Sequence, residues 1–109
     1  GVPNYGYVFN VPRIEDVPAT IINNYEAIEI AKREQVSISF DQAAMTPYFT
    51  YYAEGKEYEV HFDDARSIKA KIFLALEYNL LGLSFWTLMN YFRATWLLID
   101  YYLDVQKVI

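Results

Sequence analysis

In residues 48–71, "YFTYYAEGKEYEVHFDDARSIKAK", the spacing of the hydrophobic residues changes from the period of about two that is typical of a strand to the period of about 3.6 that is typical of a helix. Up to Phe62, aromatic and β-branched residues form two runs on either side of Gly55, which predicts two strands joined by a tight hairpin turn. From Asp63 onward the apolar residues recur at helical spacing, and Asp63 or Asp64 is suited to cap the first turn. This stretch therefore predicts a hairpin followed directly by a helix.

The second strand of the hairpin is predicted to have two different faces. Tyr58, Val60 and Phe62 alternate on one side, which we expect to be buried. The residues between them carry charge, so the side with Glu59 and His61 is expected to face water. We interpret His61, the only histidine, as a solvated surface residue.

Upstream of the hairpin the pattern predicts a strand, a helix and a second, shorter strand. The apolar run Val2–Phe9 is typical of a buried strand, and a proline-containing loop follows it. Asn23 and Glu26 have the spacing of a capping box, which predicts a helix over residues 24–34. The alternating "VSISF" at 36–40 predicts the short strand.

Downstream of the hairpin the sequence predicts a helix, a strand and a final helix. The first helix should bury a stripe formed by Ala65, Ile68, Ile72 and Leu76 and end at Asn79 or Gly82. The continuous apolar run "LLGLSFWTLM" at 80–89 is typical of a parallel strand that is buried on both faces. Residues 95–109 then form a helix with one polar side.

This order predicts an α/β fold with an α+β insertion. We expect residues 1–10 and 63–109 to form the α/β part and residues 11–62 to form the insertion. Two parallel strands make a poor sheet by themselves, because a parallel sheet needs several neighbours and cover on both faces. Partner strands are therefore expected elsewhere. The chain also starts without an initiator methionine, so we expect a fragment or a processed product.

Composition excludes several classes of function. A net charge of −5 argues against binding nucleic acid, and no basic run or long apolar segment indicates a membrane. The absence of cysteine excludes disulfides and thiolate metal sites, and a single histidine excludes histidine-based metal clusters. Phosphate-binding loops, dinucleotide fingerprints and nucleophile elbows are absent from the sequence. We therefore predict no cofactor and no metal.

Aromatic residues are the remaining candidates for a site. They make up 18% of the chain, a surplus that serves cores, interfaces and sugar-binding clefts. Tyr5 follows one predicted strand and Trp86 ends another, which is the strand end where barrel-type α/β proteins bind ligands. From position alone, core packing and ligand contact are equally good interpretations of these two rings.

Three stretches in this order resemble a known family. "GVPNYGY" (1–7), "FDDARSIKAK" (62–71) and "GLSFWTL" (82–88) are similar to the last third of family 18 glycoside hydrolases, the chitinase-like TIM barrels. The stretch "FDQAAMTPYFTY" (40–51) resembles the bacterial spore-envelope branch that acts on peptidoglycan. The resemblance covers nearly the whole chain, and its second and third stretches are fairly specific.

The resemblance implies a role for individual residues. The chain would supply barrel strands seven and eight, and the insertion would form one wall of the cleft. Trp86 matches the ring that forms the floor under the sugar whose bond is cut, and Tyr5 matches a tyrosine beside the cleft. Tyr7 stands where many chitinases carry an arginine, so the substrate contacts at this position differ from those of a plain chitinase.

The resemblance also implies which group is missing. In the family a glutamic acid at the end of an aspartate-rich motif protonates the glycosidic oxygen, and the substrate's own N-acetyl group attacks the sugar. No D-x-x-D-x-D-x-E string occurs in this sequence. We therefore expect no catalytic residue here and no activity of this chain alone.

Two functions follow as hypotheses. In the first, the chain is the C-terminal segment of a glycoside hydrolase that cleaves β-1,4-linked N-acetylglucosamine glycans, in peptidoglycan or chitin. In the second, it is a non-catalytic sugar-binding or assembly module. The expected partners are an N-acetylglucosamine-containing glycan and either the remainder of the barrel or a second copy of the chain. The resemblance alone implies an extracellular or spore-envelope location.

Overall fold

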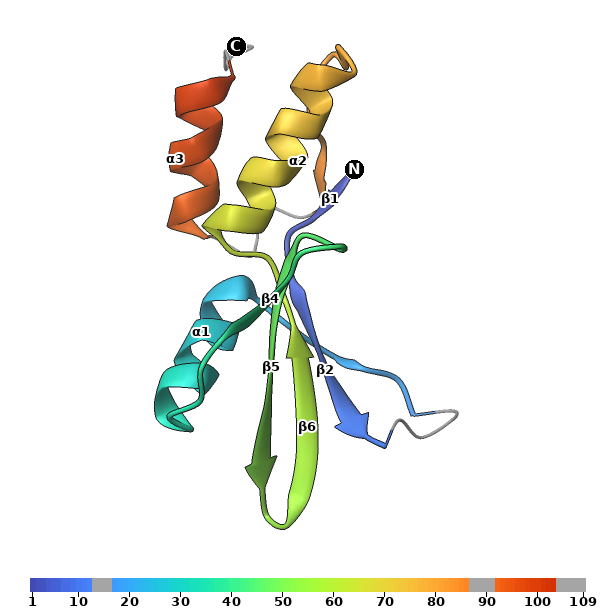
Figure 1. Cartoon of the computed structure of the whole chain (residues 1–109), viewed down its shortest axis with the longest axis vertical. Coiled ribbons are helices and arrows are strands. Elements are labelled where there is room, and N and C mark those ends of the chain that lie inside the picture. Colours follow the sequence, from blue (N-terminus) through green and yellow to red (C-terminus); the bar gives the residue numbers. More distant parts are fainter. Residues whose placement is uncertain (13–16, 87–91, 104–109) are drawn as a thin grey trace.

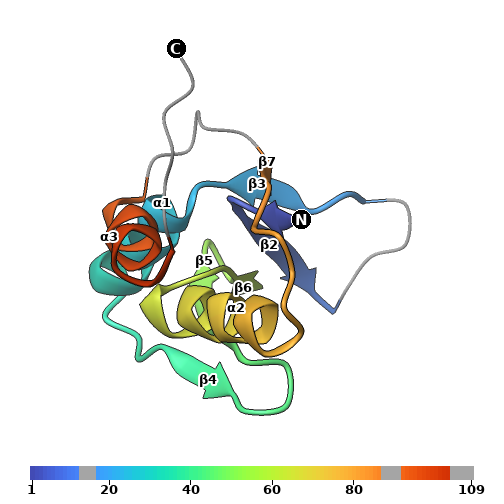
Figure 2. The same cartoon turned by 90° about the horizontal axis from the view of Figure 1, so that it is seen from above.

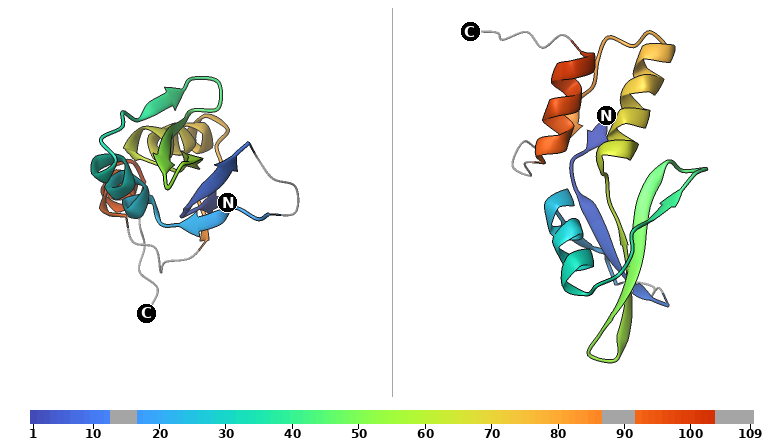
Figure 3. Two further views of the ribbon diagram at one scale, coloured as in Figure 1. Left: turned by 90° about the horizontal axis from the view of Figure 1, so that it is seen from below. Right: turned by 60° about the vertical axis from the view of Figure 1, so that its left-hand side comes forward.

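The protein has an α+β architecture with two sheets and is elongated, with extents of 49 × 31 × 30 Å. The structure is a computed structural model that describes residues 1–12, 17–86 and 92–103. One end contains helices α2 and α3 with a small parallel sheet, and the other contains helix α1 with a larger antiparallel sheet (Figures 1 and 3). In a view down the long axis, α1 and α3 lie on one side of the molecule and β2 and β3 lie on the other (Figure 2).

The larger sheet has five antiparallel strands in the order β3-β2-β6-β5-β4. Their bounds are Gly6–Val11 for β2, Thr20–Ile22 for β3, Ser39–Asp41 for β4, Thr46–Ala53 for β5 and Lys56–His61 for β6. The predicted hairpin is confirmed as β5 and β6. Glu54 and Gly55, which join them, both have positive φ, as the tight turn of a two-residue hairpin requires.

One face of this sheet forms the first hydrophobic core with helix α1 (Asn24–Arg33). Phe49 and Val60 are paired across β5 and β6 and are 2% and 0% exposed. Ala27 and Ala31 of α1 are buried against them, because two small residues one turn apart allow the helix to approach the sheet closely. The predicted burial is thus confirmed for Val60 and Phe62, whereas Tyr58, the third residue predicted for this face, is only half-buried.

Helix α1 begins and ends as local sequence signals dictate. Asn23 accepts a hydrogen bond from the Glu26 backbone N–H at 2.7 Å, which confirms the predicted cap. At the other end Gln35 has a positive φ, and the N–H of Val36 bonds back to the carbonyl of Ala31. Val36 therefore packs against the core, and the strand predicted over 36–40 is shorter than expected, starting only at Ser39.

The single strand predicted over Val2–Phe9 is divided between the two sheets. Its first part, β1 (Val2–Pro3), pairs in parallel with β7 (Phe85–Trp86), while its second part is β2 of the larger sheet. The buried Asn4, which is 1% exposed, lies at the change of sheet. The parallel strand predicted within the run at 80–89 is confirmed at Phe85–Trp86, and residues 87–89 lie outside the described part of the chain.

The parallel pair of strands forms a second core with helices α2 (Ala65–Glu77) and α3 (Arg93–Tyr102). Ile68 and Ile72 of the predicted stripe are 1% and 0% exposed. The prediction is wrong for Ala65 and Leu76, which are exposed. The next buried residue of the helix is Ala75 instead. Helix α2 is followed by Asn79 at positive φ, as predicted. The final helix is confirmed over residues 95–102. It begins two residues earlier than predicted, at Arg93, and it ends at Tyr102, because Leu103 is extended; residues 104–109 lie outside the described part.

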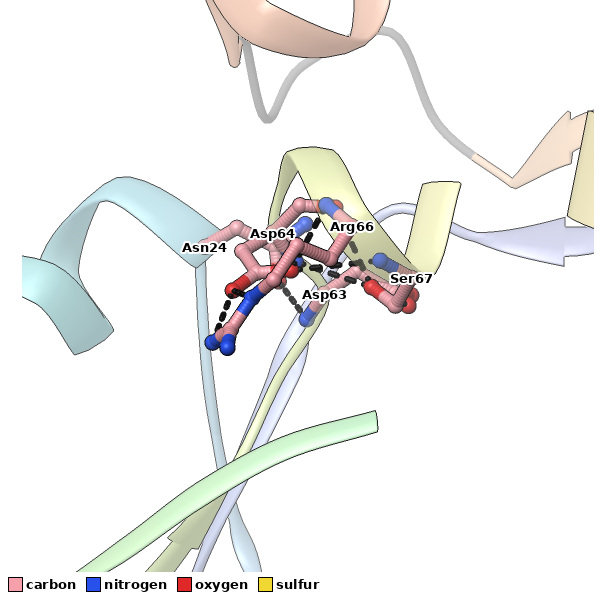
Figure 4. Close-up of polar contacts among 5 residues, drawn as sticks. All are labelled: Asn24, Asp63, Asp64, Arg66 and Ser67. Atoms are coloured by element: carbon pink, nitrogen blue, oxygen red, sulfur yellow. Dashed lines mark hydrogen bonds and ion pairs between the residues drawn. The ribbon is translucent and has the colours of Figure 1, made fainter. Parts of the chain in front are cut away.

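The start of α2 shows why two aspartates stand side by side (Figure 4). Asp64 is the N-cap, and its carboxylate accepts hydrogen bonds from the backbone N–H groups of Arg66 and Ser67 at 2.9 and 3.2 Å. It also forms an ion pair with the Arg66 side chain at 2.8 Å. The prediction of an aspartate cap is confirmed for Asp64, which satisfies backbone donors that have no partner within the helix.

Asp63 has a different role, because it is buried and joins three elements (Figure 4). Both carboxylate oxygens accept hydrogen bonds from Lys71 at 2.8 Å, and one also accepts from the Ser67 hydroxyl at 2.7 Å. The backbone N–H of Asp63 donates to the side chain of Asn24 at the start of α1. The end of β6 is thereby fixed to both α1 and α2.

Replacing Gly6 tests the close contact between β2 and β6. A Cβ atom at this position would lie 2.7 Å from the His61 carbonyl oxygen and 2.8 Å from the Phe62 Cβ, so a backbone shift is unavoidable. We expect Gly6→Ala to lower the free energy of unfolding by roughly 1–3 kcal/mol, measured by urea denaturation. Gly82→Ala is the matched control, because an added Cβ there meets nothing within 4 Å. Equal stability of the two variants would contradict this account.

Replacing Lys71 tests the buried carboxylate. The side chain of Asp63 is 7% exposed and that of Lys71 is 33% exposed, so water compensates only in part when the cation is lost. We expect Lys71→Met to cost about 2 kcal/mol in urea denaturation, and Asp63→Asn combined with it to cost less than the sum of the two. Lys32→Met on the exposed side of α1 should have little effect. Additive effects of the two substitutions would show that the pair contributes nothing.

Candidate functional site

Tyr5 and Tyr7 lie together at the junction of the two sheets. The Tyr7 hydroxyl donates a hydrogen bond to the Tyr5 oxygen at 3.4 Å, and the rings meet edge to face with centroids 5.4 Å apart. Both side chains are half-buried, and both line a hollow of about 260 Å³ that also includes Pro3, Asp63 and Lys71. The structure therefore brings two of the three predicted site residues into contact.

The third predicted residue, Trp86, is placed by its backbone. Trp86 pairs with Pro3 in the parallel sheet, and Pro3 is two residues before Tyr5. The position of the Trp86 side chain is outside what the structure describes. The parallel pairing nevertheless puts the carboxyl ends of β1 and β7 next to each other, which is the arrangement that the sequence predicted.

A row of side chains crosses the larger sheet on the face opposite α1. The ladder pairs Tyr7 with His61 and His61 with Tyr48, so that three neighbouring strands contribute one ring each. His61 is stacked on Tyr48 at 5.8 Å, and Phe9, one step further along β2, meets His61 edge to face at 5.9 Å. Tyr7 and Phe9 are themselves stacked at 5.9 Å. We call Tyr5, Tyr7, Phe9, Tyr48 and His61 the aromatic strip.

The face predicted to be wet is therefore only partly exposed. The His61 side chain is 41% exposed, and its Nε2 lies 2.6 Å from a carboxylate oxygen of Glu59. Sequence reasoning missed this histidine, because its aromatic neighbours come from β2 and β5 rather than from its own strand. The signal that could have found it is the alternation of Tyr5, Tyr7 and Phe9, which places three rings on one face of a strand.

A groove runs beside the aromatic strip. A hollow of about 500 Å³ is lined by Tyr7, Phe9, Asn10, Val11, Glu59 and His61. Its size falls in the range of small-molecule sites, and it combines apolar rings with a few polar groups that can accept or donate hydrogen bonds. This combination suits a ligand that has both apolar faces and hydroxyl or amide groups, as sugars have.

The hydrogen bond between the two tyrosines changes the acid–base behaviour of Tyr7. Its donation to Tyr5, the partial burial of the ring and the neighbouring charge of ionised Tyr5 all raise the pKa of Tyr7 above the ordinary tyrosine value. Tyr7 therefore keeps the phenolic proton that it donates to Tyr5 to a higher pH than an ordinary tyrosine does.

The described residues were compared with the requirements of a metal-binding cluster and of a membrane-spanning helix. They contain no cluster of three or more histidine, cysteine, aspartate or glutamate side chains that could hold a metal ion. Within residues 1–12, 17–86 and 92–103, every helix is too short or too polar to cross a membrane. Asp63 and Asp64 do not form a catalytic pair, because each is committed to the start of α2.

Comparison with known proteins shows which proteins contain a similar segment. No family model matches the chain. The cortical fragment-lytic enzyme of Bacillus subtilis (strain 168) is 42% identical over 105 residues, which are 94% of this chain and 24% of that enzyme. The crystal structure of the spore cortex-lytic enzyme SleL from Bacillus megaterium QM B1551 matches with a TM-score of 0.93 and 38% identity, over 98% of this chain and 25% of that one.

The likeness extends to chitinases. A chitinase from Chromobacterium violaceum ATCC 12472 matches with a TM-score of 0.80 and 26% identity, over 92% of this chain and 31% of that one. The chain is homologous to part of the spore cortex-lytic enzymes and chitinases, and it spans about a quarter of the length of the curated relatives it matches. The predicted resemblance to the spore-envelope enzymes is thus confirmed.

Removal of the Tyr5 hydroxyl tests the contact between the two tyrosines. In Tyr5→Phe the pKa of Tyr7 should fall towards the ordinary value of about 10, because the acceptor of its hydrogen bond is lost. The measurement is a pH titration of ¹³C-labelled tyrosine ring carbons by NMR, with Tyr7→Phe to assign the signal. Tyr52→Phe, a change at an exposed ring, should leave the titration of Tyr7 unchanged. An unaltered pKa in Tyr5→Phe would contradict the hydrogen bond.

Proposed function

Taking the homology to spore cortex-lytic enzymes as the premise, we propose that this chain is the C-terminal segment of a glycoside hydrolase that cleaves β-1,4-linked N-acetylglucosamine glycans. Peptidoglycan is the preferred substrate and chitin the second. The observation that carries the proposal is the parallel pairing of β1 with β7, which puts Trp86 beside the strand that leads to Tyr5. Ligands of parallel α/β barrels bind at this end of the strands.

On this proposal β1 and β7 are strands seven and eight of a TIM barrel. Helix α2 connects them, and the five-stranded sheet with α1 is inserted between β1 and α2. We keep the proposed division into residues 1–10 and 63–109 on one side and 11–62 on the other. Strand β2, which begins at Gly6, belongs to the larger sheet, so the first segment contributes residues to both parts. The insertion would stand above the strand ends and present the aromatic strip to the cleft.

Trp86, Tyr5 and Tyr7 are proposed to bind the sugar. Trp86 would form the apolar floor under the sugar at the cleavage point, since an aromatic ring can pack against the C–H face of a sugar. Tyr5 and Tyr7 would supply hydroxyl groups from the side, where the hydrogen bond between them holds the two rings together. The acid that protonates the glycosidic oxygen would come from another part of the barrel, because the motif that carries it does not occur in this sequence.

The proposed partner in assembly is the remainder of the barrel. The parallel sheet of the described chain consists of two short strands, whose outer edges need further strands. Leu80 and Leu81, next to β7, are 59% and 110% exposed and would gain cover from a neighbour. A second copy of the chain is the alternative. By analogy with its relatives, the enzyme would act in the spore envelope or outside the cell.

A non-catalytic sugar-binding or assembly module is the second candidate function. It is favoured by one observation, namely that the whole aromatic strip lies on this chain and needs no residue from a missing part of a barrel. The two functions differ in what happens when the chain is placed in an active enzyme.

A chimera tests the first function. The quarter of Bacillus megaterium SleL that this chain matches is replaced by residues 1–109, and release of product from peptidoglycan and from a chromogenic N-acetylglucosamine oligomer is measured. We expect the chimera to be active and the 109-residue chain alone to be inactive. Trp86→Ala in the chimera should lower kcat/KM by about 30-fold, the size of a major aromatic contact.

The control for the chimera is Tyr78→Ala, which removes a ring that is 68% exposed at the end of α2. It should leave kcat/KM nearly unchanged. A folded but inactive chimera that still binds the oligomer would favour the non-catalytic module. Hydrolysis by the isolated chain would overturn the assignment of the acid to another part of the enzyme.

A further inference from the structure

Helix α3 carries apolar residues on the side that faces away from the second core. Ile99 is buried in that core together with Ile68 and Ile72 of α2. Leu97 lies two positions before Ile99, which turns its side chain by about 200° around the helix, and it is 58% exposed. Tyr101, one turn beyond Leu97, is 80% exposed. Packing in the core therefore does not account for either residue.

The exposed apolar surface continues from α3 onto α2. The two helices pack side by side and run in the same direction (Figure 1). The exposed ring of Phe73 on α2 meets Tyr102 edge to face with centroids 5.1 Å apart, and Tyr102 meets Tyr101 at 4.7 Å. We call Phe73, Leu97 and Tyr101 the outer helical face. An exposed apolar surface that spans two helices is typical of a contact between proteins.

The charges beside this face run against the helix dipoles. In α3, Arg93 is the first residue and Asp100 lies in the last turn, while in α2 Lys69 stands one turn before Phe73 and Glu77 one turn after it. These two described helices have no acidic residue in the first turn and no basic residue in the last. Because anions stabilise a helix near its N-terminus and cations near its C-terminus, helix stability does not explain this order of charges.

The same order of charges is complementary to itself when one copy is reversed. If a second copy packs antiparallel about a two-fold axis through Leu97, Arg93 of each copy lies opposite Asp100 and Tyr101 of the other. Opposite charges then meet at both ends, and the two Leu97 side chains meet in the middle. Antiparallel packing also sets opposite ends of the helix dipoles beside each other. Charge complementarity therefore favours a second copy of this chain as the occupant of the face.

We propose that the outer helical face is the interface of a homodimer in which α3 packs antiparallel against α3 of a second copy. The inference goes beyond the proposed function and does not depend on it. The two are compatible, because the helices of a TIM barrel form its outer ring and further strands would join at β1 and β7 instead.

Sedimentation equilibrium of the 109-residue chain over a range of concentrations measures the dissociation constant of the dimer. We expect Leu97→Gln, which removes the central apolar contact but retains a good helix former, to raise this constant by about tenfold. Ile21→Gln is the matched control, because Ile21 is 59% exposed on β3 in the larger sheet, and it should leave the constant unchanged. A wild-type chain that is monomeric at every concentration overturns the proposal.

An exchange of charges tests the antiparallel orientation. Arg93→Glu and Asp100→Arg should each raise the dissociation constant by about threefold to tenfold, since two pairs of opposite charges become pairs of like charge. The double variant should restore the wild-type constant, because the exchanged charges still pair. Each single change suits the helix dipole better than the wild-type residue, so weaker association is not the result of a less stable helix. A double variant as weak as the sum of the single variants overturns the proposal.

Two further measurements distinguish other contacts. Leu81 lies next to β7, so dimers that are lost in Leu81→Gln and kept in Leu97→Gln would be joined at the open parallel sheet, which overturns the proposal. The chimera with SleL should also sediment as a dimer that Leu97→Gln dissociates. A monomeric chimera would show that the remainder of the barrel covers the face, and it overturns the proposal as well. The proposed function fails on activity and this inference on mass, so the two failures are distinguishable.

Discussion

The structure depends on the buried carboxylate of Asp63, because it lies where β6 ends and α2 begins. Burying a charge costs free energy unless it is paired and hydrogen-bonded, and here Lys71 and Ser67 provide three hydrogen bonds in compensation. The N–H of the same residue binds Asn24 of α1. One residue at the end of β6 is thus bonded to both neighbouring helices, α1 through Asn24 and α2 through Ser67 and Lys71.

The arrangement of the two sheets determines where Tyr5 and Tyr7 lie. The two tyrosines lie where the chain passes from β1 to β2, so one end of their segment belongs to each sheet. Gly6 between them permits β2 to approach β6 so closely that Tyr7 stands opposite His61. The strip of rings is therefore a consequence of backbone packing. Because α1 occupies the other face, these rings form a surface that is open to a ligand.

Local signals in the sequence were sufficient for the elements that form locally. The hairpin turn at Gly55, the cap of α1 at Asn23 and the cap of α2 at Asp64 each depend on residues within a few positions, and all three were predicted. The division of the run Val2–Phe9 was not predicted. Only the pairing partners separate the two strands, because β1 pairs with β7 whereas β2 pairs with β3 and β6.

For the candidate site, too, the sequence indicated the local features but not the contacts that form across the sheet. Tyr5 and Tyr7 were predicted as site residues from the sequence, and the structure places their rings in contact with each other. The placement of Trp86 at the end of a parallel strand agrees with its backbone pairing. His61 was read as a solvated residue because charged neighbours on its own strand suggested water. Its ring partners Tyr48 and Phe9 reach it across the ladder, and this register is a property of the sheet that no single strand reveals.

On the proposed function, the residues that bind the sugar and the acid that protonates it lie on different parts of the enzyme, and this separation has a physical consequence. An acid contributes to the rate only when the glycosidic oxygen is held at the right distance, and the free energy for holding it comes from contacts with sugars remote from the bond. A neutral sugar offers no charge to pair with, so these contacts must come from apolar faces and hydroxyl groups. A rigid row of rings with a few carboxylate and amide groups meets that need. On the proposed function, this chain would supply positioning to a reaction whose proton donor lies elsewhere in the barrel, and the buried Asp63 would keep the two in register.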